Sequence, residues 1–365
     1  MAFKMRIGIT GSGGFLGWHT MCYLRTYHPE VEIVRIPSEN LLTLDGIESE
    51  IDCLLHIAGV NRGTDDEVLN GNIALARGVA AIVQNSDKPI SIIYANSISA
   101  GQPGPYGEGK KRALEILVDS ASSSGVSSVN LPNLFGEHGK ANYNSFVATF
   151  VQNVLTGEKS KIVDRDISLL HVQDAANLLI QPTGLVSTYR PVGLWETNIQ
   201  SVHALLSSQW ERYATGHFPD LESRFDLNVF NTLRAASFET RPEIHLQRKS
   251  DERGYLFEAS VSKNGACQSF VSLTQPGFVR GNHFHASKVE RFVVLKGQAE
   301  IKLKKLFTDQ VLTFKVSEAD SIAIDMPTFW SHNITNTGND ELFTYFWSDG
   351  NFDPEFPDTF PDVIF

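Results

Sequence analysis

The sequence has few cysteines, and none of its apolar runs is long enough to cross a membrane. Its 365 residues include 3 cysteines, Cys22, Cys53 and Cys267, which are widely spaced and form no CxxC pair. Such a set excludes a disulfide scaffold and predicts a protein of the reducing cytoplasm. No apolar segment approaches the roughly 18–20 residues that span a bilayer, so we expect no membrane insertion. The N-terminus leads directly into a glycine turn, without the pattern of a cleavable signal.

Positive charge is also scarce. The chain has 31 lysines and arginines against 42 aspartates and glutamates, a net charge of −11. Such a surface repels phosphate backbones, so we expect no nucleic-acid partner, although a local basic pocket could hold a small phosphate. Apolar residues make up 42% and charged residues 20%, as in globular proteins. The length predicts two domains, each with its own core.

The first half of the chain alternates short apolar runs with longer amphipathic stretches. Five runs are predicted to be buried strands: Met5–Thr10, Glu32–Ile36, Cys53–Ile57, Ile90–Ala95 and Val126–Leu131. Three stretches between them are predicted to be helices: Trp18–Tyr27, Asn72–Gln84 and Glu108–Ser120. This alternation predicts a Rossmann-type, doubly wound parallel sheet with helices on both faces.

The pattern changes near residue 242. Two helical segments, His203–Ala214 and Leu221–Ala236, precede Pro242. Beyond it, short alternating runs rich in Phe, Val and Ile are punctuated by Gly, Pro and Asn, which is typical of an antiparallel sandwich or barrel. These runs are Gln268–Leu273, Glu290–Leu295, Ala299–Leu303, Ser321–Ile324 and Leu342–Trp347. We therefore expect one domain over residues 1–242 and an all-β domain over 243–365.

A glycine-rich turn follows the first predicted strand. Gly11, Gly14 and Gly17 recur at three-residue spacing, and Phe15 and Leu16 open the helix that follows. Glycines here allow a tight turn, a close approach of backbone N–H groups to a pyrophosphate, and close packing of helix on strand. The strand–turn–helix context therefore predicts a dinucleotide site that includes these five residues.

The second predicted strand indicates which dinucleotide is bound. It ends without an acidic residue for a ribose 2′-hydroxyl, and carries Arg35, with Ser38 nearby. A cation at this place suits a 2′-phosphate, which favours NADPH over NADH. The alternative is that Arg35 is only a solvated charge at the end of a strand.

A tyrosine and a lysine open the helix near residue 108. Tyr106 and Lys110 lie four residues apart, so both side chains share one helix face. An ammonium beside a phenol favours its ionisation, which suits the tyrosine to protonate a carbonyl during reduction. Ser97, at the end of the preceding strand, would donate a hydrogen bond to that carbonyl, with Ser99 as the alternative.

These motifs resemble, in order over residues 5–180, the nucleotide-sugar branch of the extended short-chain dehydrogenase/reductases. The segment that includes His56, Ala58 and Gly59 resembles the one that passes beneath the cofactor, so the resemblance adds Ala58 and Gly59 to Tyr106 and Lys110 as cofactor contacts. Further similar segments are Asn72, Leu131–Gly136 and Leu170–Ala175. One departure is Gly109, where the family usually has serine.

Histidines with metal-ligand spacing lie in the second half. His283 and His285 would share one face of a strand, Glu290 would begin the next strand, and His332 would come from a later hairpin. Three imidazoles and a carboxylate in an apolar barrel suit a divalent transition metal. We prefer Zn²⁺, although the spacing also admits iron, manganese or nickel.

This spacing resembles the two motifs of the cupin superfamily, and the second motif departs from the pattern. Ser321 and Phe329 stand where glycines are usual. Asp251–Glu258 and Val279–His283 also resemble the 4-keto-6-deoxyhexose 3,5-epimerase branch of cupins. In that branch the histidine matching His283 is a base, so His283 has two candidate roles, and we favour metal ligand.

The two halves together resemble the CapF family of capsular polysaccharide enzymes. The similar stretches include His56–Arg62, Asn142–Phe150 and Pro276–His285. The resemblance implies C3 epimerisation of a UDP-2-acetamido-2,6-dideoxy-hexos-4-ulose by the cupin, then NADPH-dependent C4 reduction to the L-talose product. It also implies a homodimer. The alternatives are a single-activity 4-ketoreductase with a structural cupin, and a non-catalytic NADP-binding regulator.

Overall fold

The computed structural model describes ten stretches of the chain. These are residues 5–37, 41, 51–121, 125–181, 186–189, 194–246, 249–251, 254–256, 267–349 and 355–364. The chain divides into two compact units, and each consists of more than one segment. The first unit comprises Met1–Phe135 and Asp166–Thr197, and the second comprises Gly136–Arg165 and Asn198–Phe365. Two predictions fall partly outside the described residues, since Ser38 and, within the resemblance over Asp251–Glu258, residues 252, 253, 257 and 258 are not among them.

A six-stranded parallel sheet forms the core of the first unit, as predicted. Its order is β2-β1-β3-β4-β5-β8. The strands are β1 (Arg6–Thr10), β2 (Glu32–Ile36), β3 (Cys53–His56), β4 (Ser91–Ser97), β5 (Val126–Leu131) and β8 (Val186–Tyr189). The chain leaves β1 for β2 at one edge and returns to β3, so the strand order reverses between β1 and β3. Ligands of such sheets bind at this reversal, beyond the carboxyl ends of the strands.

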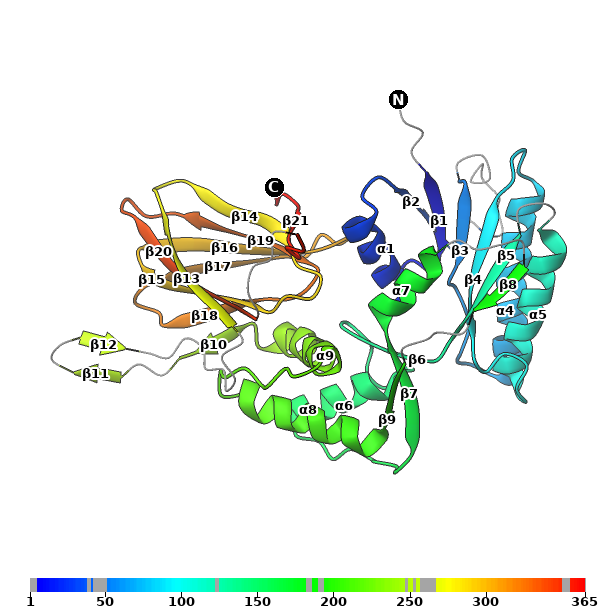
Figure 1. The fold of residues 1–365 in the computed structure, drawn as a ribbon, viewed down its shortest axis with the longest axis horizontal. Helices are drawn as coiled ribbons and strands as arrows, with labels where there is room; N and C mark the ends of the chain where they lie inside the picture. The colour runs from blue at the N-terminus through cyan, green and yellow to red at the C-terminus, as the bar shows by residue number, and fades with distance from the viewer. Residues whose placement is uncertain are drawn as a thin grey trace. The chain divides into compact units, whose positions relative to one another are not determined.

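Helices cover both faces of this sheet. Helices α1 (Phe15–Tyr27) and α7 (Val172–Ile180) lie on one face, and α4 (Asp65–Gln84) and α5 (Pro105–Ser120) lie on the other (Figure 1). Helix α4 begins at a capping box, in which the Thr64 hydroxyl accepts from the Glu67 backbone N–H and the Glu67 carboxylate accepts from that of Thr64. Three further strands form a small separate sheet. They are β6 (Asn133–Phe135), β7 (Asp166–His171) and β9 (Trp195–Asn198), in the order β6-β7-β9.

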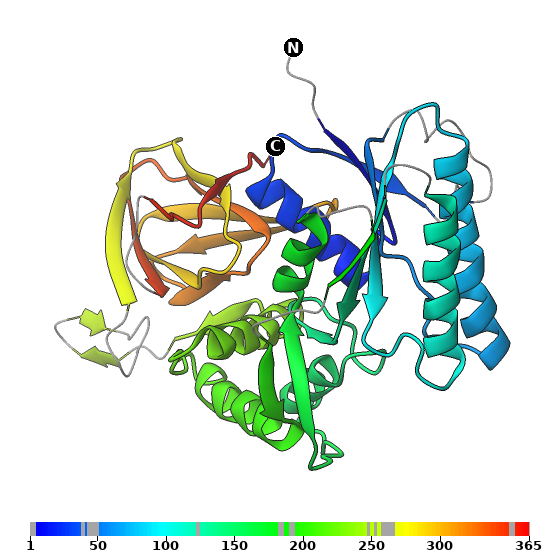
Figure 2. The same ribbon diagram turned by 45° about the vertical axis from the view of Figure 1, so that its right-hand side comes forward.

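Two five-stranded antiparallel sheets dominate the second unit (Figures 1 and 2). One sheet contains β10 (Glu243–His245), β18 (Ile322–Met326), β15 (Glu290–Lys296), β20 (Leu342–Asp349) and β13 (Cys267–Thr274). The other contains β17 (Val311–Ser317), β16 (Gln298–Lys305), β19 (Trp330–Asn336), β14 (Val279–Phe284) and β21 (Phe360–Pro361). Residues from both sheets, among them Phe292, Ile301 and Trp330, form one buried core. The prediction of antiparallel β structure after residue 242 is confirmed. The pair β11 (Lys249–Asp251) and β12 (Gly254–Leu256) forms a separate ribbon.

Three helices belong to the same compact unit as these sheets. They are α6 (Phe146–Thr156), α8 (Ile199–Tyr213) and α9 (Arg224–Thr240). The buried Arg234 of α9 donates a hydrogen bond to the Met326 carbonyl at 3.1 Å. The Phe218 ring stacks on Trp347 at 3.9 Å between centroids. The division into two functional domains at residue 242 stays a prediction. Across the described residues, no helix is long and apolar enough to span a bilayer.

Candidate active site and candidate metal centre

The glycine turn has the geometry that a dinucleotide requires. Gly11 has a positive φ of 70°, and a Cβ atom there would come within 2.7 Å of the Ala58 backbone nitrogen. A Cβ on Gly17 would lie 2.1 Å from the Gly11 carbonyl oxygen, so only glycine allows α1 to start this close to β1. At the first turn of α1 there is no acidic residue, and the cap Gly14 has no side chain to accept its N–H groups. The helix terminus is thus suited to a pyrophosphate.

A buried hydrogen-bond network joins β1 to β3 beneath this turn. The Thr10 hydroxyl accepts from the backbone N–H groups of Ile57 and Ala58, at 3.1 and 3.2 Å, and lies 2.9 Å from His56 Nδ1. Because the hydroxyl oxygen already accepts two hydrogen bonds, we infer that the Thr10 hydroxyl donates its own hydrogen bond to His56 Nδ1. Burial, with the nearby charge of Lys110, lowers the pKa of His56 to about 3, so this imidazole is neutral. The segment predicted to pass beneath the cofactor is therefore held rigidly.

The structure brings Ser97, Tyr106 and Lys110 together at the carboxyl end of β4. The Ser97 side chain hydrogen-bonds Tyr106, and this bond partly offsets the burial that raises the pKa of Tyr106. The Ser99 backbone N–H donates to Ser97 Oγ at 3.1 Å. Ser97 is the serine whose side chain interacts with the tyrosine. Lys110 Nζ lies 6.0 Å from the centroid of the Tyr106 ring.

Lys110 is an almost completely buried cation. Its Nζ donates to the Ala95 carbonyl at 2.9 Å and lies 4.7 Å from the centroid of the Tyr94 ring. Burial lowers the pKa of Lys110 to about 8. A Cβ on Gly59 would come within 3.4 Å of the same Nζ, which places Gly59 directly beside the ammonium. Sequence reasoning did not find Tyr94, whose ring helps to compensate the buried charge.

The two glycines within the Tyr–Lys motif allow α5 to pack closely. A Cβ on Gly107 would lie 2.3 Å from the Gln102 carbonyl oxygen. At Gly109 it would lie 3.3 Å from the Leu69 carbonyl oxygen of α4. Glycine in place of serine at position 109 thus suits the close approach of α5 to α4. The first turn of α5 is helical despite this glycine. Arg35 is exposed near the end of β2, the edge strand of the sheet.

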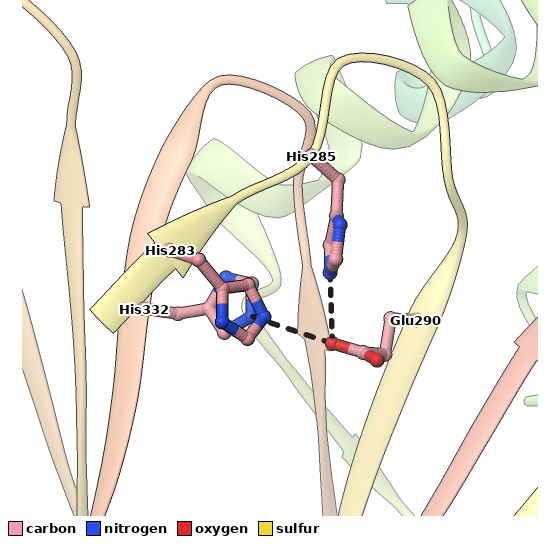
Figure 3. Close-up of side chains that lie close together, drawn as sticks. All are labelled: His283, His285, Glu290 and His332. Atoms are coloured by element: carbon pink, nitrogen blue, oxygen red, sulfur yellow. Dashed lines mark hydrogen bonds and ion pairs between the residues drawn. The ribbon is translucent and has the colours of Figure 1, made fainter. Parts of the chain in front are cut away.

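The four predicted metal ligands converge in the second unit (Figure 3). The ligand atoms of His283, His285, Glu290 and His332 all lie within 4.8 Å of one another. His283 and His332 are direct partners in the β14–β19 ladder, and their Nε2 atoms are 3.1 Å apart. A Glu290 oxygen lies 3.1 Å from His285 Nε2 and 3.3 Å from His332 Nε2. Two nitrogens bound to one tetrahedral zinc lie roughly 3.3 Å apart, so the spacing fits such an ion.

The outer nitrogens of two imidazoles are held by backbone carbonyls. His285 Nδ1 lies 2.5 Å from the Asp358 carbonyl oxygen, and His332 Nδ1 lies 3.2 Å from that of Trp330. These contacts favour the tautomer with an unprotonated Nε2, the atom that can bind a metal. Burial and the two neighbouring imidazoles lower the pKa of His283 to about 3, and burial lowers that of His332. Burial raises the pKa of Glu290, but the close approach of His285 and His332 outweighs burial, so the pKa of Glu290 is lowered.

The two positions where cupins usually have glycine retain a left-handed backbone. Ser321 has a φ of 53° and Phe329 has a φ of 61°, in a region that residues other than glycine rarely adopt. The Phe329 backbone N–H donates to the His285 carbonyl at 2.8 Å, so this turn supports the end of β14. Both positions therefore have the backbone conformation that glycine favours, although neither residue is glycine.

Comparison with known proteins finds relatives that match nearly the whole chain. Residues 249–360 match the family model of the polysaccharide biosynthesis C-terminal domain. A Pseudomonas aeruginosa protein named UDP-2-acetamido-2,6-beta-L-arabino-hexul-4-ose reductase is 28% identical over 367 residues, covering 98% of each chain. The crystal structure of the capsular polysaccharide assembling protein CapF from Staphylococcus aureus is 28% identical, with a TM-score of 0.60, over 99% of this chain and 100% of that one.

The chain resembles CapF along its whole length. The resemblance predicted from the sequence is thereby confirmed. A second CapF structure, with the inhibitor 3-isopropenyl-tropolone, is 25% identical with a TM-score of 0.56 over 99% of this chain and 100% of that one. The Bordetella bronchiseptica enzyme WbmH, in complex with NAD⁺, shares only the fold, at 13% identity and a TM-score of 0.50 over 64% of this chain and 98% of that one.

Proposed function

We propose that this chain is a bifunctional nucleotide-sugar enzyme of capsule or O-antigen synthesis. Its second unit epimerises C3 of a UDP-2-acetamido-2,6-dideoxy-hexos-4-ulose, and its first unit reduces the C4 ketone with NADPH. The product is UDP-2-acetamido-2,6-dideoxy-L-talose, a precursor of UDP-N-acetyl-L-fucosamine. The convergence of Ser97, Tyr106 and Lys110 beside a dinucleotide turn supports the reduction most directly. The name of the Pseudomonas relative supports a 4-keto UDP-sugar as substrate.

Ser97 and Tyr106 act on the ketone oxygen. Their hydroxyls are hydrogen-bonded to each other, so both can reach one carbonyl oxygen. NADPH, when bound, supplies the hydride that adds to C4. Tyr106 donates its proton to the oxygen as negative charge develops there, and Ser97 stabilises that charge by a hydrogen bond. The ammonium of Lys110 favours the phenolate that the proton transfer leaves behind.

Several residues would hold the cofactor. The turn of Gly11, Gly14, Phe15, Leu16 and Gly17 offers the pyrophosphate site. Ala58 and Gly59 follow β3 on the other side of the strand-order reversal. Arg35 would meet the 2′-phosphate that distinguishes NADPH from NADH. Its position near the end of the edge strand β2 supports that role.

The four-ligand cluster would hold a divalent metal, with Zn²⁺ preferred. His283, His285, Glu290 and His332 provide a neutral-nitrogen and carboxylate set that zinc binds readily. A ketone at C4 acidifies the adjacent C3–H, and a metal, when bound, supplies stabilisation of negative charge in that region. We assign all four residues as ligands, because each points its ligand atom at the same small volume. The base that removes the C3 proton is not among the assigned residues.

One observation favours the single-activity alternative for the second unit. Four protein ligands complete a tetrahedral zinc shell, and closed shells are typical of structural zinc sites. In that case the first unit would be a 4-ketoreductase and the metal would only stabilise the β sheets. A cytoplasmic location and a homodimer remain predictions from the sequence.

Product analysis tests the proposal. Purified protein is incubated with the UDP-4-keto-6-deoxy-N-acetylhexosamine and NADPH, and the product is examined by NMR. The proposal predicts oxidation of NADPH and a product with inverted C3 and reduced C4. In Tyr106→Phe, the reduction rate should fall at least ~10²-fold while NADPH still binds. Unchanged turnover in this variant would refute the assigned role of Tyr106, whereas NADPH binding without any turnover in the wild type would favour a non-catalytic cofactor-binding protein.

A further inference from the structure

The C-terminal segment 355–364 lies against β14, which leads into the metal-ligating loop. Phe360 stacks on Phe284 with ring centroids 5.3 Å apart and planes inclined by 27°. The Asp362 backbone N–H donates to the Asn282 carbonyl at 2.9 Å. We call this segment the C-terminal strap. It packs beside the strand that carries His283, although it contributes none of the four ligands.

Within the strap, Asp358 fastens the loop that joins His285 to Glu290. Its carboxylate accepts from three successive backbone N–H groups: Ala286 at 2.9 Å, Ser287 at 3.0 Å and Lys288 at 2.7 Å. It also accepts from the Ser287 hydroxyl at 2.9 Å. Four hydrogen bonds to one carboxylate fix the loop, and so fix how His285 and Glu290 face each other.

The backbone of the same residue acts directly on a ligand. The Asp358 carbonyl oxygen lies 2.5 Å from His285 Nδ1, and the backbone adopts a positive φ of 41°. Such a conformation is costly for a residue other than glycine and persists where surrounding contacts require it. Asp358 thus holds the loop with its side chain and the imidazole with its main chain.

We propose that Asp358 is the positioning residue of the metal centre. This inference rests on the metal site of the proposed function. Asp358 fixes the tautomer and orientation of His285 and the path of loop 286–288, so that the four ligand atoms converge before the ion arrives. Loss of its carboxylate leaves His285 and Glu290 free to separate, and the metal is held less tightly.

Metal affinity in full-length variants tests this role. Asp358→Ala removes all four carboxylate hydrogen bonds, and Asp358→Asn keeps one acceptor oxygen. Thr359→Ala, at the neighbouring strap residue, removes only a hydroxyl that accepts from Lys288 Nζ and donates to the Pro357 carbonyl. Zn²⁺ affinity is measured by competition with a chromophoric chelator, and Co²⁺ reports the ligand field through its visible spectrum. We expect roughly 10–100-fold weaker binding and an altered Co²⁺ spectrum in Asp358→Ala, a smaller loss in Asp358→Asn, and wild-type values in Thr359→Ala.

Two outcomes separate this inference from the proposed function. If the wild-type protein binds neither Zn²⁺ nor Co²⁺, the metal site itself is wrong, and the positioning role falls with it. If the wild-type protein binds Zn²⁺ tightly and Asp358→Ala binds it equally well, only the positioning role is overturned. Should Asp358→Ala fail to fold, Asp358→Asn decides, because wild-type affinity and an unchanged Co²⁺ spectrum in that variant would overturn the role as well.

Discussion

At the scale of single residues, the buried charge of Lys110 is central to the chemistry proposed for the first unit. Lys110 is only 4% exposed, and its ammonium is compensated by the Ala95 carbonyl and the Tyr94 ring instead of by a carboxylate. Among the residues that the structure describes, no carboxylate pairs with this ammonium, and burial lowers the pKa of the lysine to about 8. In the proposed mechanism, the charge that assists Tyr106 is therefore sensitive to pH in a range that is easily measured.

The rate of C4 reduction should depend on the charge of Lys110. Because the lysine is protonated below its pKa of about 8, the rate should be level near pH 7 and should fall about tenfold per pH unit well above pH 8. The pKa of Tyr106 is raised, so loss of its own proton does not explain this fall. The measurement is single-turnover NADPH oxidation from pH 6 to 10. A level profile up to pH 10 would contradict the role of Lys110, and Lys110→Arg should shift the fall to higher pH.

Arg35 should set the cofactor preference. Arg35→Ala removes a charge-assisted hydrogen bond to a 2′-phosphate, which contributes about 1.5–3 kcal/mol. The ratio of kcat/KM for NADPH to that for NADH should therefore fall about 10–100-fold, with little change for NADH itself. Steady-state kinetics with both cofactors provides the test. An unchanged ratio would mean that Arg35 is only a solvated charge.

At the scale of elements, close packing of a helix on a strand shapes the cofactor turn. Gly17 lies where α1 passes the Gly11 carbonyl, whereas a Cβ on Gly13 in the same turn would meet nothing within 4 Å. The two glycines share a sequence motif but differ in how much space a side chain would have. They therefore form a matched pair for mutagenesis.

Gly17→Ala should destabilise the first unit and weaken NADPH binding, because the added methyl group collides with the backbone of Gly11. We expect a loss of roughly 1–3 kcal/mol in the free energy of unfolding. Gly13→Ala should fold as stably as the wild type, within about 0.5 kcal/mol. Thermal unfolding and NADPH titration check both variants. Equal stability of the two would show that the close approach at Gly17 is absent.

Strand positions were predictable from the sequence because short runs that alternate with longer helical stretches indicate the strands of a parallel sheet. The edge strand β2, however, is not the buried strand that was predicted, since only Ile36 is buried in it. Glu32–Ile36 and Val126–Leu131 match β2 and β5 residue for residue. Helix starts were missed, because first turns carry polar, proline or capping residues instead of the apolar pattern. Helix α4 begins at Asp65, seven residues before the predicted Asn72, and α5 begins at Pro105.

At the scale of the whole molecule, the cluster of candidate metal ligands was predictable and the contacts that support it were not. Metal-ligand spacing identified His283, His285, Glu290 and His332, since ligand types at fixed spacing are visible in one stretch of sequence. Asp358 lies 72 residues beyond Ala286, to which it is bonded, and no local pattern indicates such a contact. The inclusion of α6, α8 and α9 in the second unit likewise depends on tertiary packing.

Removal of the metal should destabilise the second unit without preventing reduction. A ligand that binds only the folded state adds about 4 kcal/mol of stability when its concentration is a thousand times its dissociation constant. Chelator-treated protein should therefore melt at a lower temperature, and Zn²⁺ should restore it. NADPH oxidation with a substrate already inverted at C3 should persist. His332→Ala serves as the control, because its melting temperature should not respond to chelator.

Exchange of the C3 proton with solvent is the most direct test that one chain performs both steps. Full-length Tyr106→Phe, loaded with Zn²⁺, is incubated in D₂O with the 4-keto UDP-sugar and no NADPH, and C3 is followed by NMR. We predict that deuterium enters C3 at the wild-type rate while reduction is lost when NADPH is added. If C3 keeps its proton in both proteins, the second unit does not epimerise this substrate, and the chain is a reductase with a structural metal site.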